Sequence, residues 1–308
     1  MVKVFIDGQA GTTGLQIKDK LLKHPQVLLL EIESEKRKDP FERQKLMNEA
    51  DVVFLCLPDA AAIEAVKLVT NPETVVIDAS TAHRTADGWV YGFPELSSEH
   101  YGKIKNAKRI ANPGCHASGF VSIVYPLVSS SVMSKDYPVT AFSITGYSGG
   151  GNKMIDEYEC PEREEEIGTP RQYGLTQNHK HLPEMKKVCG LDSYPVFMPV
   201  VSDYYCGMAV SVPLITSKLT VEGGIDAVYN LYKNFYKDSK FINVSLAPQG
   251  GFLSPLGHEG TNRMTIYVTG NDERIVVTSV FDNLGKGASS AAVENMNIAM
   301  GFDETTAL

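Results

Sequence analysis

The sequence predicts an α/β protein that combines a doubly wound parallel sheet with an inserted α+β unit built on a mixed or antiparallel sheet. Strand-like and helix-like segments alternate over residues 2–78, as expected for a parallel sheet with crossover helices. From residue 139 onward the strand-like segments are longer, and only residues 221–236 among them have a helical pattern. The chain has 308 residues, which suits two domains of roughly 150 residues each.

The first unit is predicted from continuous apolar runs separated by helical segments. Strands that are buried on both faces give such runs instead of an alternation of apolar and polar residues. We expect strands over Val2–Asp7, Val27–Ile32, Asp51–Leu57 and Thr74–Asp78. We expect helices between them over Thr12–His24, Phe41–Glu49 and Ala60–Val69. This order of strand, helix and strand indicates a parallel sheet with helices on both faces.

The second unit is predicted from longer strands, several of which alternate with period two. They cover Val139–Thr145, Gly207–Leu214, Met264–Thr269 and Ile275–Phe281. A last helix over Gly287–Met300 is rich in alanine and serine, so we expect it to pack closely. We therefore expect one domain of residues 1–115 with 284–308, and an inserted domain of residues 116–283.

Composition and charge exclude several classes of protein. The chain has 29 Lys and Arg against 37 Asp and Glu, a net charge of −8, which argues against binding to nucleic acid or anionic membranes. No apolar run reaches the roughly 18 residues of a transmembrane helix, and the first residues turn polar too early for a signal peptide. The five cysteines show no CxxC spacing, so we expect neither a disulfide framework nor a zinc ribbon, but a reduced, cytoplasmic protein.

A glycine-rich turn, Gly8-Gln-Ala-Gly11-Thr-Thr-Gly14, joins the first predicted strand to the first predicted helix. Glycine lets the backbone approach a pyrophosphate, and the helix N-terminus adds free N–H groups and the positive end of a dipole. Thr12 and Thr13 add hydroxyl donors. The alternative is a tight turn without a ligand. Because the turn lies between strand and helix, as the motif requires, we expect a dinucleotide.

The segment after the second predicted strand favours NADP over NAD. Domains that bind NAD carry an acidic residue there, and Glu33 could fill that role. The residues that follow include Ser34, Lys36, Arg37 and Lys38, which suit the additional 2′-phosphate of NADP. The alternative is that these cations belong to an ordinary solvated loop, and Glu33 keeps NAD open.

Cys115 is the candidate nucleophile. It follows the turn Asn112-Pro-Gly and precedes an apolar helical segment over residues 120–128. We therefore expect the thiol at or near a helix N-terminus, where the dipole and free N–H groups stabilise a thiolate. The same N–H groups would serve as an oxyanion hole. Cys56, by contrast, lies inside a predicted strand and is expected to be a small buried residue.

A nucleophilic cysteine needs a base, and His179-Lys-His181-Leu-Pro-Glu184 supplies two histidines and a carboxylate. We expect His181 to be the acid/base, because Leu-Pro predicts a helix start that places Glu184 in the first turn, within reach of the ring. His179, on the same side of an extended segment, is the alternative base or a substrate contact. Zinc is disfavoured because further ligands at suitable spacing are missing, and we expect no metal.

Two motifs are specific in combination, Pro113-Gly-Cys115 and His179-Lys-His-Leu-Pro-Glu184. With further matches at residues 8–14, 78–84, 91–96, 146–151 and 282–287, the chain resembles the N-acetyl-gamma-glutamyl-phosphate reductase family, in its short form, throughout its length. His116 stands where the long form is expected to have an aromatic residue. The family is similar in plan to aspartate-semialdehyde dehydrogenase and glyceraldehyde-3-phosphate dehydrogenase.

The resemblance implies NADPH-dependent reduction of an acyl phosphate, N-acetyl-gamma-glutamyl phosphate, to the semialdehyde in arginine biosynthesis. It implies that Cys115 forms a thioester and that one histidine transfers protons, with His179 and Glu184 in the substrate site. By similarity to the related dehydrogenases, Arg84 holds the substrate phosphate and Asn283 contacts the nicotinamide carboxamide. The alternatives are a surface salt bridge for Arg84 and an Asp-Asn turn for Asn283. We also expect a homo-oligomer to which the second sheet contributes.

Two other functions remain open. One is a related dehydrogenase that acts on an aspartyl or aminoadipyl substrate, and the two motifs disfavour the aspartyl type. The other is a non-catalytic sensor that binds NADP. The presence of Cys115 together with two histidines and Glu184 argues against a sensor.

Overall fold

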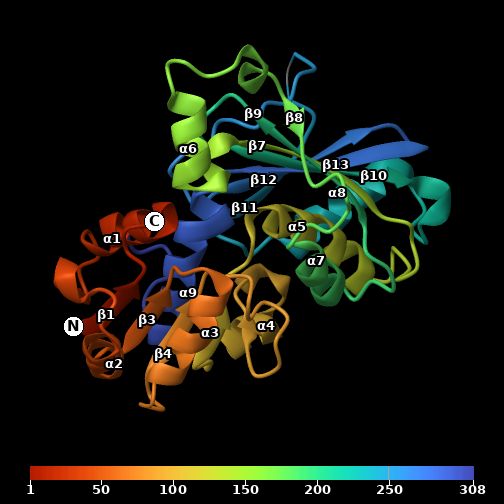
Figure 1. Ribbon diagram of the computed structural model, residues 1–308. Helices are drawn as coiled ribbons and strands as arrows, with labels where there is room; N and C mark the ends of the chain where they lie inside the picture. The colour runs from red at the N-terminus through yellow and green to blue at the C-terminus, as the bar shows by residue number, and fades with distance from the viewer. Residues whose placement is uncertain (249) are drawn as a thin grey trace. The chain divides into compact units, whose positions relative to one another are not determined.

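The computed structural model describes residues 1–248 and 250–308, which form two compact units (Figure 1). The first unit comprises residues 1–113 and 288–308, and the second comprises residues 114–287. Each unit is built on one sheet, and the predicted α/β class is confirmed. In the described part of the chain, no helix is both long enough and apolar enough to span a bilayer.

The first unit contains a six-stranded sheet of order β2-β1-β3-β4-β6-β5, in which all neighbouring strands are parallel. The strands are β1 Val2–Asp7, β2 Val27–Leu30, β3 Val52–Leu55, β4 Val75–Asp78, β5 Val90–Tyr91 and β6 Arg109–Ala111. The helices are α1 Thr12–Leu21, α2 Pro40–Glu49, α3 Asp59–Leu68, α4 Ser98–Lys105 and α9 Ser290–Met300. The doubly wound parallel sheet is confirmed, although the sequence did not predict β5, β6 and α4.

Successive residues of the central strands pack on opposite faces of this sheet. Val4 and Ile6 of β1 lie in one buried cluster with residues of α1, α4 and α9. Phe5 lies in another cluster with residues of α2 and α3. Helices therefore cover both faces, which is the physical reason for the continuous apolar runs. The helix α9 is buried along most of its length, as its alanine and serine content predicted.

The second unit contains a seven-stranded mixed sheet of order β11-β12-β13-β10-β7-β9-β8. The strands are β7 Thr140–Gly146, β8 Arg171–Gln172, β9 Val196–Ser202, β10 Met208–Ile215, β11 Ile242–Leu246, β12 Met264–Gly270 and β13 Arg274–Phe281. The helices are α5 Cys115–Ser129, α6 Asn152–Glu159, α7 Leu182–Cys189 and α8 Gly224–Phe235. The expectation that residues 221–236 form the one helix among these strands is wrong. The helix α6 has eight residues, too few for helical periodicity to be evident. The helix α7 is equally short, and only its start was predicted, from Leu182-Pro.

The helix α5 lies against one face of this second sheet and so positions its first residue, Cys115. Gly119 allows the close approach, because a Cβ there would lie 2.4 Å from Cγ2 of Val210 on β10. From α8, the hydroxyl of Tyr232 donates to the carbonyl oxygen of Ile123 at 2.8 Å. Close packing and a buried hydrogen bond thus fix the helix that carries the candidate nucleophile.

Candidate active site

The glycine-rich turn after β1 has a backbone that requires glycine at two positions. Gly8 has a φ of +88°, and a Cβ on it would lie 2.3 Å from the carbonyl oxygen of Cys56. A Cβ on Gly14 would lie 2.5 Å from the carbonyl oxygen of Gly8. The nearest atom to a Cβ on Gly11 is at an ordinary 3.7 Å. The turn therefore requires glycine at residues 8 and 14, whereas a side chain at residue 11 would meet no close neighbour.

The N-terminus of α1 faces this turn with backbone amides. Gly11 is the N-cap residue and provides no side-chain cap, and the helical hydrogen bonds begin with Leu15 N–H to the Gly11 carbonyl at 2.9 Å. The backbone amides of residues 12–14 lie before this first helical hydrogen bond. The first turn of α1, all of it described, contains no acidic residue. This backbone fits the pyrophosphate of a dinucleotide. Its contacts with Gly8, Gly11, Thr12, Thr13 and Gly14 stay a prediction.

The loop after β2 begins with a short 3-10 helix, Ser34–Lys36, and its side chains are exposed. Nζ of Lys36 lies 3.0 Å from Oε2 of Glu33, and this hydrogen-bonded pair raises the pKa of Lys36. Glu31 is paired with Lys18 of α1 at 2.8 Å. Glu31 and Glu33 are thus both in exposed ion pairs, which contribute little to stability. The polar and cationic groups of the loop are accessible to a ligand.

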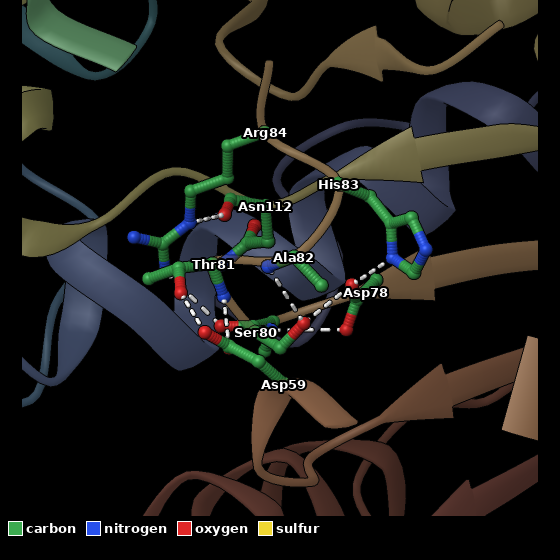
Figure 2. A network of polar contacts seen from close by, with 9 residues as sticks. Asp59, Asp78, Ser80, Thr81, Ala82, His83, Arg84 and Asn112 are labelled. Atoms are coloured by element: carbon green, nitrogen blue, oxygen red, sulfur yellow. Dashed lines mark hydrogen bonds and ion pairs between the residues drawn. The ribbon is translucent and has the colours of Figure 1, made fainter. Parts of the chain in front are cut away.

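A buried carboxylate organises the loop after β4, as Figure 2 shows. Asp78, at the end of β4, accepts hydrogen bonds from the backbone N–H and the hydroxyl of Ser80 at 2.9 and 2.6 Å. Its other contact is Nδ1 of His83 at 2.6 Å. Thr81 is tied to Asp59 at the start of α3 through its N–H and its hydroxyl. The loop that leads to Arg84 is therefore held at several points.

Arg84 lies at the carboxyl ends of the parallel strands. Its Nε donates to the carbonyl oxygen of Asn112 at 2.9 Å (Figure 2). A terminal nitrogen of the guanidinium donates to the carbonyl oxygen of Ala79 at 3.1 Å. These contacts hold the guanidinium at the edge where ligands bind in open α/β sheets. The contact with a substrate phosphate stays a prediction.

Cys115 is the first residue of α5, so the prediction that it lies at a helix N-terminus is confirmed. The first helical hydrogen bond runs from the Ser118 N–H to the Gly114 carbonyl at 2.8 Å. The backbone amides of residues 115–117 therefore lie before the first hydrogen bond within the helix. The positive end of the helix dipole thus lies near the thiol. The cysteine is partly exposed. A Cβ on Gly287 would lie 2.9 Å from Cβ of Cys115, so glycine there permits a close approach.

The other four cysteines differ from Cys115 in their surroundings: three have a raised pKa, and the fourth is exposed. Burial, with nearby carboxylates, raises the pKa of Cys56 to about 12. The same causes raise the pKa of Cys206 to about 12, and burial raises the pKa of Cys189. Such thiols carry almost no thiolate at neutral pH. Cys160 is exposed.

Glu184 lies in the first turn of α7, as predicted, and is 1% exposed. Its Oε2 accepts a hydrogen bond from the backbone N–H of Gly114 at 3.1 Å. This contact joins the start of α7 to the residue before Cys115. The sequence predicted a contact between this carboxylate and an imidazole, but it did not predict the contact with the backbone of α5.

The two histidines before α7 lie together. The ring centroids of His179 and His181 are 4.7 Å apart, with the planes at 87°. Nδ1 of His179 accepts a hydrogen bond from the backbone N–H of His181 at 3.2 Å. An accepting Nδ1 carries no hydrogen, so neutral His179 carries its hydrogen on Nε2 and acts as a donor. In the described residues, no group of three or more His, Cys, Asp or Glu side chains could hold a metal ion.

His116, the residue after Cys115, lies at the centre of a set of contacts that the sequence did not predict. Its buried ring contacts both of these histidine rings, with centroid distances of 5.4 and 5.6 Å. Its Nδ1 lies 2.7 Å from Oγ of Ser143, and its Nε2 lies 2.6 Å from the hydroxyl of Tyr173. Burial, with the positive charges of His179 and Lys180, lowers the pKa of His116 to about 3. The ring is therefore neutral near pH 7 and cannot be the general acid.

Asn283 is buried, and its amide binds groups of the second unit. Its Oδ1 accepts from the N–H of Gly207 at 2.8 Å, and its Nδ2 donates to Oγ of Ser148 at 3.1 Å. The side chain therefore holds the glycine-rich segment Tyr147–Gly150. Its contact with the nicotinamide carboxamide stays a prediction.

Comparison with known proteins decides the family. The semialdehyde dehydrogenase NAD binding domain matches residues 3–104, and the semialdehyde dehydrogenase dimerisation domain matches residues 115–283. N-acetyl-gamma-glutamyl-phosphate reductase 2 of Nostoc sp. is 42% identical over 99% of each chain. The N-acetyl-gamma-glutamyl-phosphate reductase of Chelativorans sp. is 43% identical over 97% of this chain and 98% of its own. The chain belongs to the N-acetyl-gamma-glutamyl-phosphate reductase family.

Solved structures show the same fold at low sequence identity. Aspartate semialdehyde dehydrogenase II from Vibrio cholerae aligns with a TM-score of 0.72 at 15% identity and covers 98% of each chain. A probable aspartate-semialdehyde dehydrogenase from Pseudomonas aeruginosa aligns with a TM-score of 0.74 at 15% identity, over 97% of this chain and 98% of its own. These similarities confirm the predicted dehydrogenase-like plan of both sheets.

Membership of the N-acetyl-gamma-glutamyl-phosphate reductase family makes this chain an oxidoreductase with a domain for a nicotinamide dinucleotide. Its predicted site residues fall in both units. Those of the first unit are Gly8, Gly11, Thr12, Thr13, Gly14, Ser34, Lys36, Arg37 and Arg84. Those of the second unit are Cys115, His179, His181, Glu184 and Asn283. The sequence missed His116 and Tyr173, whose mutual contact joins positions 57 residues apart.

Proposed function

We propose that the protein reduces N-acetyl-gamma-glutamyl phosphate to N-acetylglutamate semialdehyde with NADPH and releases phosphate, as a step of arginine biosynthesis. The observation that supports this most is the start of α5. There Cys115 lies at the first helical position, and Glu184 binds the preceding amide. The histidine pair contacts the ring of His116, the second residue of the same helix. Relatives at 42–43% identity bear the name of this reductase.

The first half of the reaction is acyl transfer to Cys115. The helix N-terminus favours the thiolate, which attacks the acyl carbon, and the bond between that carbon and the phosphate oxygen then breaks. His181 accepts the proton when Cys115 enters as a thiol. The amides at the start of α5 stabilise the oxyanion of the tetrahedral intermediate. The product is a thioester on Cys115 and free phosphate.

The second half releases the aldehyde. Bound NADPH supplies the hydride that reduces the thioester carbonyl. The thiohemiacetal on Cys115 then loses its C–S bond, which returns the sulfur as a thiolate and frees the semialdehyde. His181 holds the proton that the hemiacetal oxygen gives up during this collapse.

A substrate panel tests the proposal in the reverse direction. We expect NADP to be reduced with N-acetylglutamate semialdehyde and phosphate, and the highest kcat/KM for this substrate among the N-acetylglutamate, aspartate and aminoadipate semialdehydes. Preference for either of the other two would assign the enzyme to that type instead. An absence of reduction with all three, together with tight NADP binding, would indicate a sensor.

We infer that the cofactor is NADP and that the loop of Ser34, Lys36 and Arg37 binds its 2′-phosphate. Replacing Lys36, Arg37 and Lys38 together by glutamine should weaken NADP while leaving NAD little changed, because the 2′-phosphate alone distinguishes them. Loss of a charge-assisted contact costs roughly 1.5–3 kcal/mol, which is about 10- to 100-fold in affinity. Equilibrium titration of both cofactors measures the effect.

A lysine of the same unit serves as the control for this loop. Lys67 on α3 is paired with Glu64 at 2.6 Å and is 64% exposed. The variant Lys67→Gln should bind both cofactors as the wild type does. Equal losses of NADP and NAD in the triple variant would show that the loop does not contact the 2′-phosphate.

The proposal includes a cytoplasmic location. All five cysteines are free, and the cytosol keeps thiols reduced. After cell fractionation, we expect the protein in the cytoplasmic fraction. Recovery from an extracytoplasmic fraction would contradict this part of the proposal.

We further propose that a second copy of the chain covers one face of the second sheet. Phe142, Val196, Ile215 and Val276 are 41, 53, 53 and 36% exposed, and the strand registers place all four on the same face. The helix α5 packs on the opposite face, against Val210. An apolar area of this kind marks an interaction surface. The family model that matches this unit is a dimerisation domain.

The double substitution Phe142→Asp and Val276→Asp should dissociate this oligomer, because it buries two carboxylates at the interface. Light scattering would show a mass reduced to that of one chain. The control is Phe252→Asp, which adds a carboxylate at a 90% exposed loop position and should leave the mass unchanged. An unchanged mass in the double variant would exclude this face as the interface.

A further inference from the structure

Three polar side chains form a hydrogen-bonded chain beside Cys115. Ser143 of β7 contacts Nδ1 of His116 at 2.7 Å, and Nε2 of His116 contacts the hydroxyl of Tyr173 at 2.6 Å. Ser143 is 0% exposed. Within residues 1–248 and 250–308, this is the only hydrogen bond of the Ser143 hydroxyl. The direction of each hydrogen bond in the chain can therefore be assigned.

The assignment starts at Ser143. A buried hydroxyl gives its hydrogen to an acceptor, and the acceptor here is Nδ1 of His116. Because His116 is neutral, an accepting Nδ1 means that the ring hydrogen is on Nε2. Nε2 then donates to the phenol oxygen of Tyr173. The phenol keeps its own hydrogen for a different acceptor.

Tyr173 contacts two histidines of the candidate site, His116 and His179. Burial, together with the charge of Cys115, raises the pKa of Tyr173, so the phenol keeps its hydrogen throughout the neutral range. Nε2 of His116, the residue after Cys115, lies 2.6 Å from the phenol oxygen, which places the phenol beside the start of α5. Its ring contacts that of His179, with centroids 5.9 Å apart. The backbone N–H of Tyr173 donates to the Pro199 carbonyl of β9 at 3.0 Å, which anchors the residue to the sheet.

We propose that Tyr173 is a further catalytic residue, whose hydroxyl donates a hydrogen bond to the acyl oxygen of the substrate on Cys115. His116 is the positioning residue that directs the phenol hydrogen toward that oxygen. The inference rests on the proposed function. Negative charge develops on the acyl oxygen both when the thiolate attacks and when hydride arrives. A neutral donor held in place there stabilises both transition states.

The substitution Tyr173→Phe removes only the hydroxyl. We expect kcat to fall by about 10²-fold with little change in KM, since the contact strengthens in the transition state. The rate at which iodoacetamide alkylates Cys115 should stay near that of the wild type, because the phenol acts on oxygen and not on sulfur. The control is Tyr229→Phe on α8, which keeps the ring 5.7 Å from Nζ of Lys233 and should leave kcat unchanged.

Two variants of His116 test the positioning role. His116→Gln keeps an amide N–H that can donate to the phenol oxygen, whereas His116→Leu has no donor. We expect His116→Leu to lower kcat and His116→Gln to recover part of that loss. In the Tyr173→Phe background, His116→Leu should cause little further loss, since it acts through the phenol.

Each outcome decides one claim. The inference is overturned if Tyr173→Phe has the wild-type kcat, or if the substitution raises KM alone. In that case an active wild type still upholds the proposed function. Alkylation slowed by the same factor as kcat would show that the phenol acts on the sulfur instead, which also overturns the inference. A wild type inactive with every semialdehyde would remove the proposed function itself, and this inference with it.

Discussion

The variant Cys115→Ser should bind NADP as the wild type does and lose activity by several orders of magnitude. A serine hydroxyl stays protonated near neutral pH, and it lacks the intrinsic nucleophilicity of a thiolate. The position at the start of α5 is retained in the variant, so the loss would report the sulfur itself. Single-turnover measurements with the acyl phosphate would follow phosphate release and thioester formation directly.

Alkylation with iodoacetamide provides the control for this prediction. Cys160 is exposed and Cys115 only partly so, so accessibility alone would label Cys160 first. We expect Cys115 to react first, because the helix N-terminus increases its thiolate fraction. The variant Cys160→Ser should retain full activity. Labelling of Cys115 no faster than Cys56, whose pKa is about 12, would refute the thiolate argument.

The parallel sheet was predictable because its signal is local. Val4, Phe5 and Ile6 are all buried, with Phe5 facing one layer of helices and its two neighbours the other. Such a strand has no polar face, and its run of apolar residues differs from the alternation of an exposed sheet. The position of Cys115 was equally predictable, because a Pro-Gly turn before an apolar helix leaves few other places for the first helical residue.

The contacts that hold the site residues join positions distant in sequence. The start of α7 was predicted from Leu182-Pro, but the sequence did not predict that Glu184 in its first turn binds the amide of Gly114, 70 residues earlier. The contact between His116 and Tyr173 spans 57 residues. Neither contact leaves a periodic pattern, because each depends on how β7, β9 and α5 pack together. The sequence therefore indicated candidate residues for the chemistry, but neither the contacts that hold them nor the place of His116 and Tyr173.

Of the two histidines before α7, His181 is expected to be the acid/base. The backbone N–H of His181 donates to Nδ1 of His179, which fixes the hydrogen of neutral His179 on Nε2 and leaves Nε2 as a donor. His181 is 4% exposed and immediately precedes the helix whose first turn carries Glu184. On these grounds we predict different tasks for two rings whose centroids are 4.7 Å apart.

Replacing His181 by asparagine should reduce the pre-steady-state rate by about 10²–10⁴-fold, the usual contribution of general acid–base catalysis. The pH profile of kcat/KM should lose the limb that reports the base in the free enzyme. His179→Asn is the matched variant. It removes a donor to the substrate, so we expect mainly a higher KM and a retained pH profile. If His181→Asn instead kept the wild-type pH profile while His179→Asn abolished it, the two roles would be exchanged, and the hydrogen bond from the His181 amide to His179 would have to break during turnover.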